Sequence, residues 1–273
     1  MKLIIQADDF SMTDATAEGI LKCCREDVMT QIFVMTNGPH SKCYVDRVVK
    51  EHPDVLLGLE INLVSGRPVS DRRTVPSLTD ERGYFLSSVK RNELDRNGKN
   101  DMSYEEILSE MTAQYERFVE YTGHKPFFTA IHSYHNQQMN DALKELQQKY
   151  HLDHFHDLTD NLTSMSFAEL GPWYQKTRKR GDAKERSLDY QYSIDPLQMF
   201  MDRECHFLTD YEDDPEYTAM LHTHASFVDK DLLDLSTLHI LRLMELNFLC
   251  SPEFKKWIKE KNIELVNFRD LVK

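Results

Sequence analysis

The chain has 273 residues, of which 40% are hydrophobic and 29% charged, and its formal net charge is −13. This negative balance argues against binding to the phosphate backbone of nucleic acids, and the apolar fraction excludes a disordered or low-complexity chain. The length suits one large globular unit, so we expect a single domain over residues 1–273.

The sequence contains no apolar stretch of the roughly 18 to 20 residues that a membrane-spanning helix needs. Its start has one basic residue, Lys2, and reaches Asp8 and Asp9 after a short apolar run, which does not fit a secretory signal. We therefore expect a cytoplasmic protein without a membrane partner. The five cysteines are scattered and form no C-x-x-C pair, so we expect core thiols at Cys23, Cys24, Cys43, Cys205 and Cys250.

Strand-like and helix-like segments alternate along the chain. Short apolar runs predict buried strands, and longer segments with apolar residues at helical spacing predict helices. This alternation favours right-handed βαβ units around a mostly parallel sheet, which is either a barrel or an open, doubly wound sheet. In chain order we predict a strand over 3–7, a helix over 14–26, a strand over 31–35, a helix over 41–51, a strand over 55–63, a helix from 103, a strand over 127–131, a helix over 137–150, a strand over 218–221, a helix from 252 and a strand over 263–268.

Two of these helices have clear start signals. Ser103 and Glu106 stand in S-x-x-E spacing, which predicts that each side chain accepts a hydrogen bond from the other residue's backbone N–H. At the second start, Ser251 is the predicted cap, Pro252 the first helical residue and Glu253 an acid in the first turn. Helices are therefore expected to begin directly after Ser103 and Ser251.

Two long stretches interrupt the alternation. Residues 64–100 are rich in turn formers and charge, and we interpret them as an excursion over one face of the sheet. Between residues 160 and 216 a basic cluster over 176–180 precedes an acidic cluster over 210–216. We interpret both clusters as solvated surfaces; the alternative is a mobile wall over a binding site or a contact between subunits.

Acids and histidines lie near the carboxyl ends of four predicted strands. These ends meet on one face of a parallel α/β fold, the face where ligands bind. Two carboxylates and one or two imidazoles on that face suit a divalent cation and leave a group for proton transfer. The residues are Asp8, Asp9, Glu60, His132, His222 and His224.

Each of these residues also has a purely structural interpretation. Asp8 and Asp9 can end a strand and cap the next helix. Glu60, inside an apolar run, is either exposed by strand alternation or buried with a cationic partner. A single histidine such as His132 is more often a core or surface residue than a ligand. His222 and His224 are two residues apart, and which of the two points inward stays open.

Other catalytic signatures are missing from the sequence. There is no G-x-S-x-G nucleophile elbow, no Walker loop and no G-x-G-x-x-G. Cys205 has only the adjacent His206 to suggest a thiolate pair. Acyl transfer through a serine elbow and nucleotide chemistry are therefore not indicated.

Several motifs, in order along nearly the whole chain, resemble those of the YdjC-like carbohydrate deacetylases: Ala7-Asp8-Asp9-Phe10, Val34-Met35-Thr36-Asn37, Gly58-Leu59-Glu60-Ile61-Asn62-Leu63, Gly123-His124-Lys125-Pro126 leading to His132, and His224-Ala225-Ser226-Phe227. The resemblance implies a distorted (β/α) barrel with long loops over the carboxyl ends of the strands. It also implies a metal-dependent hydrolase that removes N-acetyl groups from amino sugars, with magnesium or zinc as the ion and a small carbohydrate as the partner. A homodimer is left open.

The same resemblance implies roles for individual residues. In the metal site the family's motif positions fall on Asp9, Glu60 and His132. Asp8 takes the place of the general base, and His224 that of the proton donor to the leaving amine. Asn62 and Arg67 are the expected substrate contacts.

The chain departs from the family motifs at several positions. Glu60 stands where the family has histidine, and Ala130 where it has aspartate. Ser11 replaces a glycine, Ala17 an asparagine, and the H-P-G motif reads His224-Ala225-Ser226. A carboxylate ligand at Glu60 favours a harder ion such as magnesium or manganese. These changes leave an alternative, a family member that binds a sugar without deacetylating it.

Overall fold

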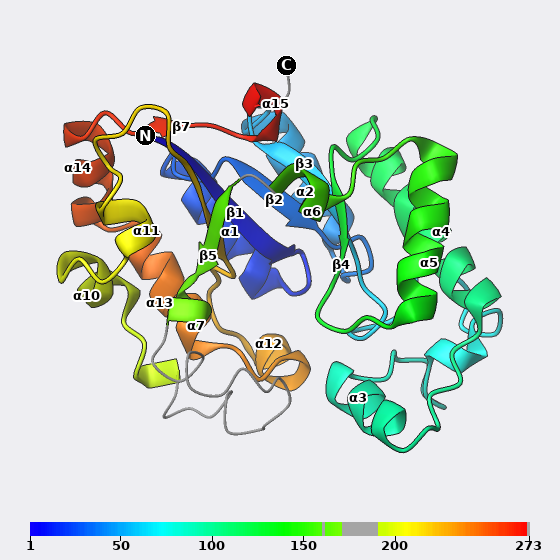
Figure 1. Cartoon of the computed structure of the whole chain (residues 1–273). Helices are drawn as coiled ribbons and strands as arrows, with labels where there is room; N and C mark the ends of the chain where they lie inside the picture. The colour runs from blue at the N-terminus through cyan, green and yellow to red at the C-terminus, as the bar shows by residue number, and fades with distance from the viewer. Residues whose placement is uncertain (160–161, 171–190, 272–273) are drawn as a thin grey trace.

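Six parallel strands curve into a half-barrel with helices around it (Figure 1). The computed structural model describes residues 1–159, 162–170 and 191–271. The strand order is β4-β3-β2-β1-β6-β5, and a seventh short strand, β7, pairs with the start of β1. The predicted distorted (β/α) barrel is thus confirmed, whereas the single domain over 1–273 stays a prediction. The strands are β1 (Lys2–Phe10), β2 (Gln31–Val34), β3 (Leu56–Ile61), β4 (Thr129–Ile131), β5 (Thr163–Ser166), β6 (Thr218–Thr223) and β7 (Glu264–Leu265).

The helices follow the strands along the chain and cover the outside of the sheet. In Figure 1, α4 and α5 lie outside β3 and β4, and α13 and α14 lie towards the β5 side. The helices are α1 (Asp14–Arg25), α2 (Ser41–Glu51), α3 (Ser88–Arg96), α4 (Tyr104–Thr122), α5 (Gln137–Tyr150), α6 (Phe155–Thr159), α7 (Phe167–Leu170), α10 (Pro196–Met201), α11 (His206–Thr209), α12 (Lys230–Leu235), α13 (Ile240–Leu249), α14 (Pro252–Glu260) and α15 (Phe268–Leu271), with a 3₁₀ turn, η1 (Pro76–Leu78).

Strand alternation separates two apolar clusters. Residues such as Leu3 and Ile5 of β1 belong to the large core beneath the helices. Residues of the opposite parity face the barrel interior, where a second cluster joins Ile4, Phe33, Leu56, Phe128, Phe155, Met220, Val266 and Phe268. Glu60 on β3 and His222 on β6 have the same parity as Leu56 and Met220 of this cluster, so their side chains also face the interior, nearer the carboxyl ends of the strands. The interior is therefore apolar at its base and titratable at the carboxyl ends of its strands.

Strand β1 contains a bulge close to its end. Ala7 pairs with Ile32 and Phe10 with Val34, so three steps on β1 match two on β2. Asp9 lies in the bulge with φ +62°, a conformation that costs a non-glycine residue free energy. The extra residue turns Asp9 towards the inner face that Asp8 already occupies.

Two acids of α4, Glu106 and Glu110, fix the excursion between β3 and α4. Glu110 is fully buried and accepts hydrogen bonds from the backbone N–H groups of Val69 and Ser70, at 2.8 and 2.9 Å. The predicted reciprocal cap at Ser103 is only half formed. Ser103 Oγ accepts from the Glu106 N–H at 3.4 Å, but the Glu106 carboxylate accepts from Ser77, because the excursion supplies a donor.

The acidic cluster over 210–216 is not wholly a solvated surface. Glu212 is 6% exposed and accepts a hydrogen bond from Trp257 Nε1 at 2.6 Å, while Lys261 Nζ lies 2.9 Å from its carboxylate. That part of the interpretation is wrong because Glu212 fastens α14 to the loop before β6. The basic cluster over 176–180 lies outside the described residues.

Two further expectations need correction. Cys43 is exposed on α2, so not all five cysteines are core thiols. The closing strand is only two residues long, Glu264–Leu265, because the chain then turns into α15. In the described ranges we find no helix with the length and apolarity required to cross a membrane.

Gly58 gives a test of the packing in the barrel interior. A Cβ at Gly58 would lie 2.1 Å from the Phe128 ring, so we expect Gly58→Ala to lower the free energy of unfolding by about 1–3 kcal/mol. Urea denaturation measures the change. In a Phe128→Leu background, where the ring is gone, the same substitution should cost much less; an equal cost in both backgrounds would contradict this packing.

Candidate active site

Asp9, Glu60 and His132 converge at the carboxyl ends of β1, β3 and β4. His132 Nδ1 lies 2.9 Å from Asp9 Oδ1 and 3.0 Å from Glu60 Oε1. One ligand atom from each residue lies within 4.8 Å of the other two, and among the described residues this is the one such group of three or more acids, histidines or cysteines. The three residues predicted as metal ligands are therefore brought together.

The backbone at Asp9 is held in place by Glu60. The Asp9 N–H donates to Glu60 Oε2 at 2.8 Å, while Glu60 Oε1 faces His132. Glu60 is 5% exposed, and His132 is its cationic partner. Of the two alternatives for Glu60, exposure by strand alternation or burial with a cationic partner, the second is therefore confirmed. The carboxylate thus both fixes the bulge of β1 and contributes to the cluster.

Strong charge interactions act within this cluster. Burial alone would raise the pKa of Asp9, but the Arg242 guanidinium and the His132 imidazole hold this pKa well below its ordinary value. Burial would lower the pKa of His132, but Asp9 and Glu60 raise it to about 10. Burial and the repulsion of Asp9 raise the pKa of Glu60 to about 7. At neutral pH and without an ion, a protonated His132 lies between the two acids.

Arg242 on α13 is a second cation beside Asp9. Its Nη2 lies 2.5 Å from Asp9 Oδ2, its side chain is 4% exposed, and its Nε donates to the Leu238 carbonyl at 2.7 Å. Despite these short distances, neither oxygen of Asp9 accepts a hydrogen bond of good geometry. The Asp9 carboxylate is therefore charge-compensated but not saturated with donors.

Asp8 faces two histidines of the neighbouring strand. Asp8 Oδ2 is hydrogen-bonded to His222 Nε2 and lies 3.9 Å from His224 Nε2. Burial would lower the pKa of His222, but Asp8 raises it to about 9. Burial and Arg242 lower the pKa of His224 to about 4. Both histidines therefore point inward, and at neutral pH His222 is charged while His224 is neutral.

Glu245 anchors the segment after β6. Its Oε2 accepts from the backbone N–H of His224 at 2.7 Å, and burial raises its pKa to about 7. Glu245 Oε1 and His224 Nδ1 are both buried without a hydrogen-bond partner. Glu245 and Arg242 lie three residues apart on α13, so one face of this helix supplies a carboxyl group and a guanidinium to the site.

The two predicted substrate contacts differ in their surroundings. Asn62 is 1% exposed, and its Oδ1 accepts from the N–H groups of Val64 and Ser65, both at 3.0 Å, so it shapes the turn after β3. Arg67 is exposed and lies over the Tyr84 ring, 4.0 Å from its centroid. A sugar contact by either residue stays a prediction.

Sequence reasoning missed the roles of His222, Arg242 and Glu245. The spacing of His222 and His224 contained a usable signal, because residues two apart on a strand share a face. Arg242 and Glu245 are the charged residues of an otherwise mainly apolar helix, ILRLMELNFL, which indicates buried partners of opposite charge. The sequence does not show that the partner of Arg242 is Asp9, because the two residues lie far apart along the chain.

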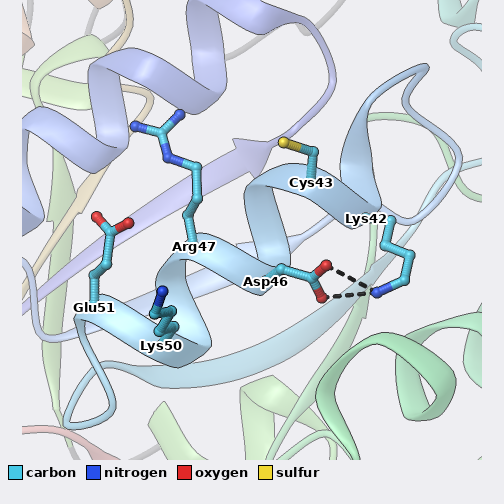
Figure 2. A pocket seen from close by; sticks show the side chains of 6 residues that line it. All are labelled: Lys42, Cys43, Asp46, Arg47, Lys50 and Glu51. Atoms are coloured by element: carbon cyan, nitrogen blue, oxygen red, sulfur yellow. Dashed lines mark hydrogen bonds and ion pairs between the residues drawn. The ribbon is translucent and has the colours of Figure 1, made fainter.

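A surface hollow elsewhere on the molecule contains none of these residues. It lies along α2, and Lys42 pairs with Asp46 on the same helix at 2.8 Å (Figure 2). Exposed i,i+4 pairs of this kind are ordinary helix-surface features. The hollow therefore offers no chemistry that competes with the strand-end site.

Comparison with known proteins agrees with the geometry. The profile described as YdjC-like protein matches residues 2–260. The chain belongs to the YdjC-like family. The resemblance of the motifs is thereby confirmed.

Relatives of this YdjC-like chain have informative names. It is 27% identical to Carbohydrate deacetylase 2 of Listeria innocua over 276 residues, covering 100% of both chains. It is 29% identical to a Carbohydrate deacetylase of Brevibacillus brevis, covering 99% of this chain and 100% of the relative. A crystal structure from Enterococcus faecalis, of a protein proposed to cleave cellobiose-phosphate, has a TM-score of 0.68 at 23% identity and covers 100% and 99% of the two chains. That structure shows a shared fold.

The ion pair between Arg242 and Asp9 can be tested through stability. Arg242→Met leaves a buried carboxylate without its guanidinium, so we expect the metal-free protein to lose about 3–5 kcal/mol of unfolding free energy. Urea denaturation at pH 7 measures the loss. Lys42→Met, which breaks the exposed pair with Asp46, is the matched control and should change little; equal effects of the two substitutions would contradict the pairing.

Proposed function

We propose that this YdjC-like protein is a metal-dependent hydrolase that removes N-acetyl groups from amino sugars or acetylated oligosaccharides. The convergence of Asp9, Glu60 and His132 beside Asp8 is the observation that supports it most. The names of the full-length relatives support the same reaction class.

The donor set fits a divalent cation. Two carboxylates and one imidazole form a mixed oxygen and nitrogen environment, and both Asp9 oxygens are buried without a hydrogen bond. The three ligand atoms are close enough to share one ion. Asp9, Glu60 and His132 would hold it, and two acids among three ligands favour magnesium or manganese over zinc. An ion bound there would polarise the acetamide carbonyl and make a bound water more acidic.

The proton transfers are assigned to Asp8 and His224. Asp8 accepts the proton of the attacking water, and the departing amine must gain a proton because an amide nitrogen is otherwise a poor leaving group. The neutral His224 has its Nε2 3.9 Å from Asp8 Oδ2. It can therefore receive the proton that Asp8 removes and pass it to the amine, without being charged at the start.

Acetate release tests the proposed reaction. We expect purified protein supplied with magnesium or manganese to release acetate from N-acetylglucosamine oligosaccharides, and a chelator to abolish the release. Enzymatic acetate assay and mass spectrometry of the sugar measure it. Intact sugars that nevertheless bind would favour the alternative, a family member that binds without deacetylating; neither turnover nor binding over a panel of acetylated sugars and ions would refute both.

Substitutions of the two neighbouring aspartates are expected to affect turnover and ion content differently. Asp8→Asn cannot accept a proton, so turnover should fall about 10²- to 10⁴-fold with ion content unchanged. Asp9→Asn removes a negative charge from the predicted ligand set, so ion content itself should fall. Elemental analysis and acetate assay of both variants separate the roles, and full activity of Asp8→Asn would show that the base is another group.

A further inference from the structure

Both oxygens of the Asp8 carboxylate accept hydrogen bonds from side chains. Asp8 Oδ2 accepts from His222 Nε2, and Asp8 Oδ1 accepts from Gln6 Nε2 at 3.1 Å. Gln6 is fully buried, and it lies beside His222 in the register of β1 and β6. The carboxylate is thus confined between two donors from adjacent strands.

Gln6 is itself held by a chain of hydrogen bonds. Gln31 Nε2 donates to Gln6 Oε1 at 2.7 Å, and the Phe268 N–H donates to Gln31 Oε1 at 3.2 Å. Gln31 is fully buried and pairs in register with Gln6. Gln31, Gln6 and His222 therefore form one row across β2, β1 and β6, directly below Asp8.

The direction of this chain follows from its last member. A backbone N–H can only donate, so the Phe268 N–H requires the oxygen of the Gln31 amide on its side. The Gln31 nitrogen must then point to Gln6 Oε1, and the Gln6 nitrogen to Asp8. One backbone group of α15 thus determines that the amide of Gln6 presents its N–H to Asp8.

We propose that Gln6, Gln31 and His222 are positioning residues for Asp8, and that this row fixes the carboxylate in the orientation that deacetylation requires. The inference rests on the proposed function, because it assigns Asp8 as the base. A carboxylate confined on both oxygens cannot rotate away from the water it must deprotonate, and a small displacement of a reacting group can lower a rate about 100-fold.

The test compares substitutions that keep or remove the donors. Gln6→Leu and His222→Leu should each lower kcat about 10- to 100-fold, with KM and ion content close to wild type. His222→Gln should stay within a few-fold of wild type, because its amide nitrogen can still donate to Asp8. If His222→Leu does not fold, His222→Asn replaces it, since the shorter amide does not reach.

A double-substitution cycle tests the transmission from Gln31. Gln31→Leu should lower kcat in the wild-type background and have no further effect in Gln6→Leu, because Gln31 acts through Gln6 alone. Gln147→Leu is the matched control: this buried glutamine donates to Thr129 Oγ1 at 2.8 Å, so its loss should affect stability and leave kcat unchanged.

Three results would overturn the positioning role. They are an unchanged kcat in Gln6→Leu and His222→Leu, a Gln31→Leu effect of equal size in both backgrounds, or a loss in His222→Gln as large as in His222→Leu. The last result would indicate that the charge or the proton of His222, and not the hydrogen bond that it donates, determines the rate.

A measurement on the metal-free protein separates this inference from the proposed function. We expect a downfield, exchange-protected imidazole N–H resonance of His222 in the NMR spectrum, which Asp8→Ala removes. If the resonance behaves so but wild-type protein releases no acetate, the proposed function fails and the hydrogen-bonded row stands. If acetate is released while the resonance is absent, the row is refuted and the function stands.

Discussion

Neighbouring residues on a regular strand point to opposite faces, yet Asp8 and Asp9 both lie in the site because the backbone turns at Asp9. The turn inserts one extra residue into β1, and the Asp9 N–H that it redirects is accepted by Glu60. Without that acceptor, a buried N–H would be left unpaired, which proteins rarely tolerate. The position of the Asp9 side chain beside Asp8 therefore depends on this hydrogen bond.

The site is built from charges that compensate one another across the sheet. Arg242 and His132 flank Asp9, while His222 flanks Asp8. Buried charges of this kind are costly when they are unpaired. Strands β1 and β6 place Asp8 and His222 through a shared inner parity, the bulge in β1 adds Asp9, and α13 adds the guanidinium from outside the sheet. The order of the strands thus decides which charges meet.

Local patterns were sufficient for most of the fold. Helices α2 and α5 have the predicted bounds, 41–51 and 137–150. Their apolar spacing and their ends depend only on residues that are close together in the sequence. The reciprocal cap at Ser103 was predicted in full but only half forms, since Ser77 of the distant excursion competes for Glu106. The convergence of the acids could be foreseen from strand ends, but the partners of Asp8 and Asp9 depend on register and on a helix more than 200 residues away. No local pattern contains that information.

Two departures from the family motifs are linked by the register of the sheet. Glu60 pairs with Ala130 across β3 and β4, so their side chains share the inner face, about 5 Å apart. An aspartate at position 130 would place a second carboxylate beside Glu60, close to Asp9, where repulsion already raises the pKa of Glu60. With alanine there, one carboxylate remains on these two strands. That carboxylate can accept from the Asp9 N–H with one oxygen and from His132 with the other, whereas a neutral imidazole offers a single acceptor. Glutamate at 60 and alanine at 130 are therefore physically compatible as a pair.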